Sequence, residues 1–300
     1  MKGYSNVMKI YNRKYKRYES VSQYGGGLLE ILYHHFLGRI LLKVVIHPVF
    51  SRVNGWYNSS SFSKRKIKPF IEEYGICMED FQKKDYTSFN DFFVRKIKPG
   101  KRPVDMQDSS LVAPADSKLL IYSIEKNNRV CVKGVDYTLS ELVGNQLDLK
   151  EYEGGKCLVF RLTMDDYHRY IFVDRGRVRR RYFIKGKLHT VSSISKEHKI
   201  YRENSRVVNV LETKNFGRIV FIEVGALLVG KIKNHPIREF EKGMEKGYFQ
   251  LGGSTILMLF QKEKMVLDED IQSICKNGIE VKVSMGESIG RKRTEVRYVR

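Results

Sequence analysis

The sequence predicts an α+β fold in which N-terminal amphipathic helices precede a β-rich core. Apolar residues recur at helical spacing between Leu28 and Phe50, and again between Lys64 and Lys84. After residue 108, short apolar or alternating runs follow one another, and turn residues separate many of them. We therefore divide the chain into a basic, helical N-terminal region, residues 1–107, and a β-rich core, residues 108–300.

The first 24 residues are polar and basic, and they predict a loosely structured arm that lacks the apolar segment of a secretory signal. Gly25-Gly26-Gly27 then precedes the first helix. Charged residues interrupt this helix, whereas a transmembrane span needs roughly 20 uninterrupted apolar residues. Two alternatives stay open: the helix lies in a membrane interface with its basic groups toward phosphates, or it packs on its own domain. Its apolar side consists of Leu29, Tyr33, Phe36, Ile40 and Val44.

Further along the chain, residues 54–61 predict a turn-rich connector between the two helices, and residues 94–103 predict a basic loop. The strands of the core are expected at seven apolar runs, with Asn and Gly residues at many of the turns between them. These runs are Leu119–Ile124, Val130–Val135, Cys157–Leu162, Val178–Ile184, Ile219–Val224, Leu227–Ile232 and Ile256–Phe260.

The composition narrows the classes of partner. The chain has 55 Lys and Arg against 34 Asp and Glu, a formal net charge of +21, which predicts polyanionic partners such as nucleic acid or an anionic membrane surface. Four scattered cysteines form no Cys-x-x-Cys pair, so they indicate reduced residues in a cytosol-facing protein and not a zinc site or disulfide framework. The histidines show no metal-ligand spacing.

The Gly253-Ser254 bond directly precedes the apolar run 255–260. Glycine permits the backbone distortion that lets a serine hydroxyl attack the preceding carbonyl. The resulting ester, after β-elimination and hydrolysis, would turn Ser254 into an N-terminal pyruvoyl group that forms Schiff bases with amines and acts as an electron sink. A Gly-Ser pair is common in a turn or bulge before a buried strand, so this pattern alone favours that structural role.

Five motifs in a fixed order favour the catalytic interpretation. Together they resemble the phosphatidylserine decarboxylase proenzyme family, from about Tyr86 to about Phe260. The motifs are residues 88–96 followed by Arg102-Pro103, residues 111–118, residues 165–170, residues 224–230 and residues 249–255.

The resemblance implies self-cleavage between Gly253 and Ser254, which leaves a β chain of residues 1–253 and an α chain of residues 254–300. Ser254 would be the nucleophile and the source of the pyruvoyl cofactor. Asp116, which alone would be read as a turn former or helix cap, would be the carboxylate that orients an imidazole. No metal or other cofactor is expected.

At the histidine positions, this chain departs from the pattern of the family. The resemblance assigns His168 to the protonation of the substrate Cα after CO₂ leaves. Many family members carry a second histidine three residues later, as the base of self-cleavage, whereas this chain has Ile171. We therefore expect His168 to be indispensable, and His189 to be a helper that enters from a neighbouring strand.

The resemblance thus implies an enzyme that converts phosphatidylserine to phosphatidylethanolamine and CO₂, and with the basic, amphipathic N-terminal region we expect it to be peripheral to the cytoplasmic face of the cell membrane. Its expected partners are the anionic lipid, the membrane surface and its own second chain; a homodimer is compatible with the sequence, and nucleic acid is not expected. One alternative is a pyruvoyl decarboxylase of a soluble amino acid. The other is an inactive basic relative that binds membranes or nucleic acid, which Ile171 keeps open.

Overall fold

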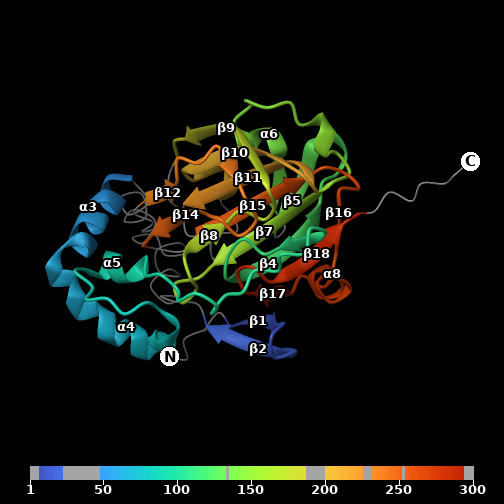
Figure 1. The fold of residues 1–300 in the computed structure, drawn as a ribbon. Helices are drawn as coiled ribbons and strands as arrows, with labels where there is room; N and C mark the ends of the chain where they lie inside the picture. The colour runs from blue at the N-terminus through green and yellow to red at the C-terminus, as the bar shows by residue number, and fades with distance from the viewer. Residues whose placement is uncertain are drawn as a thin grey trace, which may run out of the picture.

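The computed structural model describes residues 7–22, 48–132, 135–186, 200–225, 231–251 and 254–293. The helix expected from Leu28 lies outside these ranges as far as residue 47, and so do His189 and Gly253. The described residues confirm the α+β fold class. Three helices from the N-terminal region, α3 to α5, lie to one side of a large, mostly antiparallel sheet (Figure 1).

Across the described residues, the main sheet has ten strands in the order β13-β9-β10-β11-β15-β7-β4-β17-β1-β2. Neighbouring strands are antiparallel except β1 and β17, which are parallel. In chain order they are β1 (Val7–Asn12), β2 (Arg17–Ser22), β4 (Ser117–Ser123), β7 (Lys156–Leu162), β9 (Gly176–Ile184), β10 (Arg206–Thr213), β11 (Gly217–Gly225), β13 (Glu239–Phe240), β15 (Ser254–Phe260) and β17 (Glu280–Val283).

Smaller elements complete the core. Two three-stranded sheets have the orders β12-β14-β8 and β16-β18-β3, and β5 pairs with β6. Their bounds are β3 (Ser110–Val112), β5 (Arg129–Val132), β6 (Val135–Thr138), β8 (Arg169–Ile171), β12 (Lys231–Asn234), β14 (Glu245–Gln250), β16 (Met265–Leu267) and β18 (Ser288–Lys292), and the helices among them are α6 (Leu139–Val143), α7 (Ile200–Glu203) and α8 (Glu269–Lys276).

Strand β15 lies between β11 and β7 and is buried on both faces. Ile256 and Met258 join the hydrophobic cluster on one face of the main sheet, whereas Leu257 and Leu259 join the cluster on the other. A strand covered on both sides has no polar face, which explains why this segment reads as a continuous apolar run. Burying each large apolar side chain contributes about 1.5–3 kcal/mol, so β15 is a main source of stability for the core.

The N-terminal helical region consists of α3 (Pro48–Ser59), a 3₁₀ helix at Ser61–Lys66, α4 (Ile67–Tyr74), a second 3₁₀ turn at Met78–Asp80 and α5 (Phe89–Phe93). The turn-rich connector expected at residues 54–61 is wrong for residues 54–59, because α3 continues through them. The single helix expected from Lys64 to Lys84 is interrupted at Gly75, whose φ of 57° is left-handed and ends α4. None of the helices that the described residues form is both long and apolar enough to cross a bilayer.

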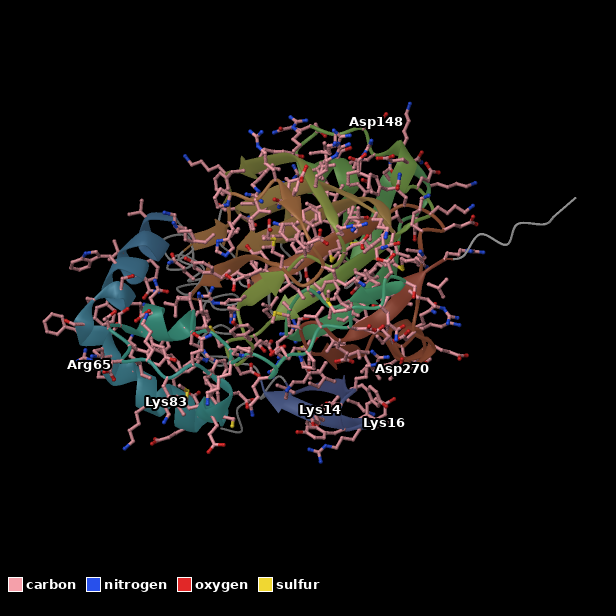
Figure 2. The ribbon with its side chains drawn as sticks, viewed as in Figure 1. Lys14, Lys16, Arg65, Lys83, Asp148 and Asp270 are labelled. Carbon is pink, nitrogen blue, oxygen red and sulfur yellow. The ribbon has the colours of Figure 1, made fainter. Side chains whose placement is uncertain are left out.

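Residues 7–22 form the β1–β2 hairpin, so the expectation of a loosely structured arm is wrong for them. The hairpin extends the main sheet, because β1 pairs with β17 from Ile10 to Asn12. Near its turn, Arg13 forms ion pairs with Asp268 at 2.6 Å, Asp270 at 2.7 Å and Glu287 at 3.0 Å. Figure 2 shows Lys14 and Lys16 at this turn, on the same side of the molecule as Asp270. The basic residues of the segment therefore belong to an ordered hairpin.

Candidate active site

Ser254 is the first residue of β15, where it pairs with Leu162 of β7 and Gly225 of β11. The residue is fully buried, and its hydroxyl has no hydrogen-bond partner among the described residues. Buried hydroxyl groups normally have a partner, and groups that lack one are candidates for a catalytic role. The structure thus places the sequence-predicted nucleophile at the end of the central strand with its oxygen unengaged.

His168 directly precedes β8 and is also buried. Its Nδ1 lies 3.0 Å from the backbone carbonyl oxygen of Asp166. Because that oxygen can only accept, Nδ1 carries the hydrogen, and Nε2 is left as an acceptor. Nε2 has no hydrogen-bond partner among the described residues. Burial, and to a smaller extent the charge of Arg95, lowers the pKa of His168 to about 3. His168 is therefore a neutral base whose free nitrogen can take up a proton.

One aromatic cluster connects His168 to the segment that precedes Ser254. The rings of Phe93 and His168 have centroids 4.4 Å apart. Phe93 belongs to the same hydrophobic cluster as Leu251, three residues before Ser254. The backbone N–H of Phe249 donates to the carbonyl of His168 at 3.0 Å. These contacts hold the histidine beside the chain segment that precedes Ser254.

Lys118 fixes the turn that carries His168, a role that no local sequence pattern indicated. Its buried ammonium donates to both carboxylate oxygens of Asp166, at 2.8 and 2.7 Å, and to the hydroxyl of Thr163. The N–H of Thr163 donates to the same carboxylate at 2.7 Å. The turn is thereby held in one conformation, which positions the Asp166 carbonyl against the imidazole.

Asp116 directly precedes β4, and the structure does not bond it to His168. Arg102 donates to its two carboxylate oxygens through Nε at 3.0 and 3.1 Å and through Nη2 at 2.8 Å, and the N–H of Met285 donates at 2.8 Å. Strand β7 separates β4 from β15, and two strand spacings amount to roughly 10 Å. Asp116 and Ser254 therefore lie at the same end of the sheet without touching.

Ile171, the position at which many family members carry the second histidine, packs next to the Asp116 turn. Its N–H donates to the carbonyl of Pro114 at 2.9 Å, and its side chain is buried. In this chain an apolar side chain thus fills the place beside Asp116, and Arg102 binds the carboxylate. His189 lies outside the described residues.

Arg169 attaches the segment after α5 to the histidine. Its guanidinium donates to the carbonyl of Val94 at 3.0 and 2.6 Å, to the carbonyl of Arg95 at 3.3 Å and to Glu245 at 2.7 Å. Residues 93–95 therefore lie against residues 168–169. The motif at residues 88–96 had no assigned role in the sequence, and the structure shows that it forms one wall around His168.

A pocket of about 630 Å³ lies next to this wall and is lined in part by Met78, Lys83, Lys84, Tyr86 and Lys98. Met78 and Tyr86 also pack against the aromatic cluster that contains Phe93. A second pocket, of about 520 Å³, lies at the edge strands β9 and β13 and includes none of the candidate residues. No group of three or more potential metal ligands occurs in the described part of the chain.

Comparison with known proteins supports these assignments at the level of the family. The sequence model described as phosphatidylserine decarboxylase matches residues 89–291. The chain is 51% identical to phosphatidylserine decarboxylase proenzyme 2 of Clostridium acetobutylicum, over 94% of this chain and 97% of that protein. It is 38% identical to the proenzymes of Clostridium novyi and Ruminiclostridium cellulolyticum, over 95% and 96% of this chain and the full length of both relatives. These matches show that the chain belongs to the phosphatidylserine decarboxylase family.

Proposed function

We propose that this chain is a proenzyme that cuts itself between Gly253 and Ser254 and then converts phosphatidylserine to phosphatidylethanolamine and CO₂. Proenzymes of this family form a pyruvoyl group from a serine by self-cleavage. The observation that carries the proposal is the Ser254 hydroxyl, which is buried at the start of β15 without a hydrogen-bond partner among the described residues. A buried donor of this kind fits a group that reacts with its own backbone.

In self-cleavage, the oxygen of Ser254 attacks the carbonyl carbon of Gly253, the peptide C–N bond breaks, and the freed nitrogen takes a proton. β-Elimination from the resulting ester releases the carboxylate of Gly253 and leaves an unsaturated residue at position 254. Hydrolysis of this residue releases ammonia and gives the pyruvoyl group. A neutral base must remove the hydroxyl proton at the first step, and His168 Nε2 has the protonation state for it.

The pyruvoyl group supplies a carbonyl that accepts the electrons left when the substrate loses CO₂. His168 moves the protons of this second reaction. When the substrate amine becomes a neutral imine, the proton that it gives up passes through His168 Nε2 to Cα, and the ring holds this proton only transiently. Because burial disfavours the imidazolium, the protonated ring gives up its proton readily. Phe93 and Leu251 keep water from this place.

We assign Asp116 a positioning role in self-processing. Its carboxylate holds Arg102 and the backbone of Met285, and thereby joins the segment before β4 to residues of the future α chain. A carboxylate bonded in this way fixes the end of the sheet at which Ser254 lies. His189 is the second candidate base, which its position in the chain suggests and the described residues do not include.

An exposed aromatic surface on the N-terminal helices supports peripheral binding to the cytoplasmic face of the membrane. Val53 and Trp56 of α3 are 60% and 77% exposed, and Phe62 in the following 3₁₀ helix is 76% exposed. Basic residues accompany them, and Figure 2 shows Arg65 and Lys83 on the outer side of this region. Each basic residue near an anionic membrane contributes about 1 kcal/mol, and aromatic side chains insert at the headgroup level.

The first test is a denaturing gel and intact mass of the purified protein. We expect two fragments that divide at Ser254, with the smaller one reactive toward hydroxylamine. A single uncut chain of 35.1 kDa would contradict the proposal.

The second test compares substrates. CO₂ release from phosphatidylserine in anionic vesicles is expected, with no release from free serine. The reverse preference would favour a decarboxylase of a soluble amino acid.

The third test concerns the exposed aromatic surface. The double variant Trp56→Ser and Phe62→Ser should weaken vesicle binding about ten-fold. The control is Phe183→Ser on β9, where an aromatic residue that is 59% exposed lies outside this region, and equal loss in both variants would exclude the N-terminal surface.

A further inference from the structure

Arg95 is a buried cation that forms no ion pair with any carboxylate in the described part of the chain. The residue is 3% exposed, and its guanidinium carbon lies 4.3 Å from the ring centroid of Phe81 and 4.8 Å from that of Phe92. Its Nε has no hydrogen-bond partner among the described residues, and the described carboxylate that acts on its charge, Asp116, is ion-paired with Arg102 instead. Burial lowers the pKa of Arg95 to about 10, so it remains positively charged at neutral pH. Aromatic faces attract a cation but leave its N–H donors unused.

Arg95 belongs to the segment that packs against His168 and Arg169. Arg169 binds the carbonyls of Val94 and Arg95, which fixes the backbone at this point. Phe93, two residues earlier, contacts the His168 ring. The charge of Arg95 also contributes, less than burial does, to the lowered pKa of His168. A substrate that reaches His168 therefore comes close to Arg95.

We propose that Arg95 binds the phosphodiester of the serine phospholipid and so determines that the enzyme acts on a lipid headgroup. This inference rests on the proposed function, because it assigns the substrate of that same site. Phosphate oxygens match the planar set of guanidinium donors, and a buried arginine without a partner has its donors available for them.

The alternative anion, the carboxylate of the serine headgroup, is disfavoured by the chemistry. An ion pair to the carboxylate would stabilise the substrate and would be lost as neutral CO₂ forms, which raises the barrier. The phosphodiester keeps its charge throughout the reaction. Binding it affects the ground state and the transition state equally, so the contact should act on the Michaelis constant and not on the turnover number.

The pocket lined by Met78, Lys83 and Tyr86 offers the lipid headgroup a route toward Arg95. Tyr86 lines that pocket, and its ring packs on Phe92 with centroids 5.4 Å apart, so Tyr86 and Arg95 share one ring. The pocket also contains Lys83 and Lys98, whose charges favour an anionic headgroup.

The experiment measures the turnover of dihexanoyl phosphatidylserine, and its inhibition by dihexanoyl phosphatidylethanolamine, with self-cleaved enzyme. The product retains the phosphodiester and lacks the carboxylate, so it separates the two anions. The variants are Arg95→Met and Arg95→Lys, and the control is Arg177→Met, an exposed arginine paired with Glu212 on the far strands β9 and β10. Self-cleavage on a gel shows that each variant folds.

For Arg95→Met we expect complete self-cleavage, a KM about ten-fold or more above that of the unchanged enzyme, a product Ki raised by the same factor, and a kcat within about two-fold. Arg95→Lys should show smaller increases, and the control none. A raised KM with an unchanged Ki would mean that Arg95 binds the carboxylate, and it would overturn the proposal. Unchanged values of both would leave Arg95 only a packing role.

If Arg95→Met is not cut, Arg95→Lys decides the question by the same two constants. Failure of both variants to self-cleave would assign Arg95 to processing, which also contradicts lipid binding. A wild-type chain that never cuts itself would instead refute the proposed function, so the two failures are distinguishable.

Discussion

Two groups of buried polar side chains lie around the start of β15, and they differ in their hydrogen bonding. The first, the ion-paired cluster, has a partner for every charge, because Asp116 binds Arg102, Lys118 binds Asp166, and Arg161 binds Glu280 with Nε at 2.9 Å from the carboxylate. The second, the unpaired group, consists of Ser254, His168 and Arg95, each with a buried polar atom that lacks a hydrogen-bond partner among the described residues.

The difference separates structural from chemical roles. A buried ion pair with complete hydrogen bonds fixes strands relative to one another, and removing one partner is strongly destabilising. A buried polar group without a partner reduces stability, so its retention points to a function. The ion-paired cluster should therefore respond to mutation through folding, and the unpaired group through the reaction.

The largest expected effect is that of Ser254→Ala, which removes the attacking oxygen and should abolish self-cleavage and decarboxylation completely, without loss of folded protein. Gel analysis and CO₂ release measure both. The matched control is Thr255→Val. Thr255 also has a buried hydroxyl without a partner among the described residues, but as the next residue of β15 it lies on the opposite face of the strand. Loss of cleavage in the control as well would show that the unpaired hydroxyls are not chemically distinct.

His168→Gln should lower the rate of decarboxylation about 10²- to 10⁴-fold and slow self-cleavage, because glutamine can hydrogen-bond but cannot move a proton at neutral pH. Rates are measured on the cleaved fraction, so that slow processing is not mistaken for slow turnover. Wild-type turnover by cleaved His168→Gln protein would remove this residue from the unpaired group.

Arg161→Met should lower the free energy of unfolding by about 3–5 kcal/mol, because it leaves the Glu280 carboxylate buried without its partner. Urea denaturation in the Ser254→Ala background measures this on a single chain. Adding Glu280→Leu should recover most of the loss. Full stability with impaired decarboxylation in Arg161→Met would place this ion pair in the reaction and break the comparison.

The smallest effect concerns acid stability. The folded pKa of His168, about 3, lies below its ordinary value of about 6.5, so the unfolded chain binds more protons between these limits. The histidine therefore lowers stability as the pH falls below about 6.5, by about 1 kcal/mol at pH 5.5. In the Ser254→Ala background, His168→Gln should lose less stability between pH 7.5 and pH 5.5 than the parent. Equal losses would show that His168 is not buried in its neutral form.

Local patterns predicted the β-rich core because β15 and its neighbours are covered on both faces, and an unbroken apolar run is the direct consequence. Strand β10 was missed. Asn209 interrupts its apolar residues and resembles a turn residue, but in the fold its amide donates to the buried Glu223 of β11 at 2.7 Å. Only the assembled sheet supplies that partner.

The same limit applies to the site and to the N-terminal region. Ser254, Asp116 and His168 could be selected from local motifs, whereas the role of residues 93–95 depends on Arg169, which lies more than 70 positions later in the chain. In α3, Asn58 suggested a turn, yet its side chain donates to the carbonyl of Asn54 at 2.7 Å within the helix. The basic residues of the first 24 positions suggested a loosely structured arm, so the β1–β2 hairpin was not predicted. Its ion pairs are with distant acidic residues, Asp268 and Asp270, around α8.

The residues that follow the proposed cut supply β15, β16, β17 and β18. Strand β15 inserts between β11 and β7, and β17 between β4 and β1, so strands of the long fragment border the short one on both sides at each place. The mature enzyme would then be a heterodimer whose interface is the protein's own interior. Fragment dissociation and global denaturation would be a single event, and the melting temperature of the processed enzyme, unlike that of its precursor, would rise with protein concentration.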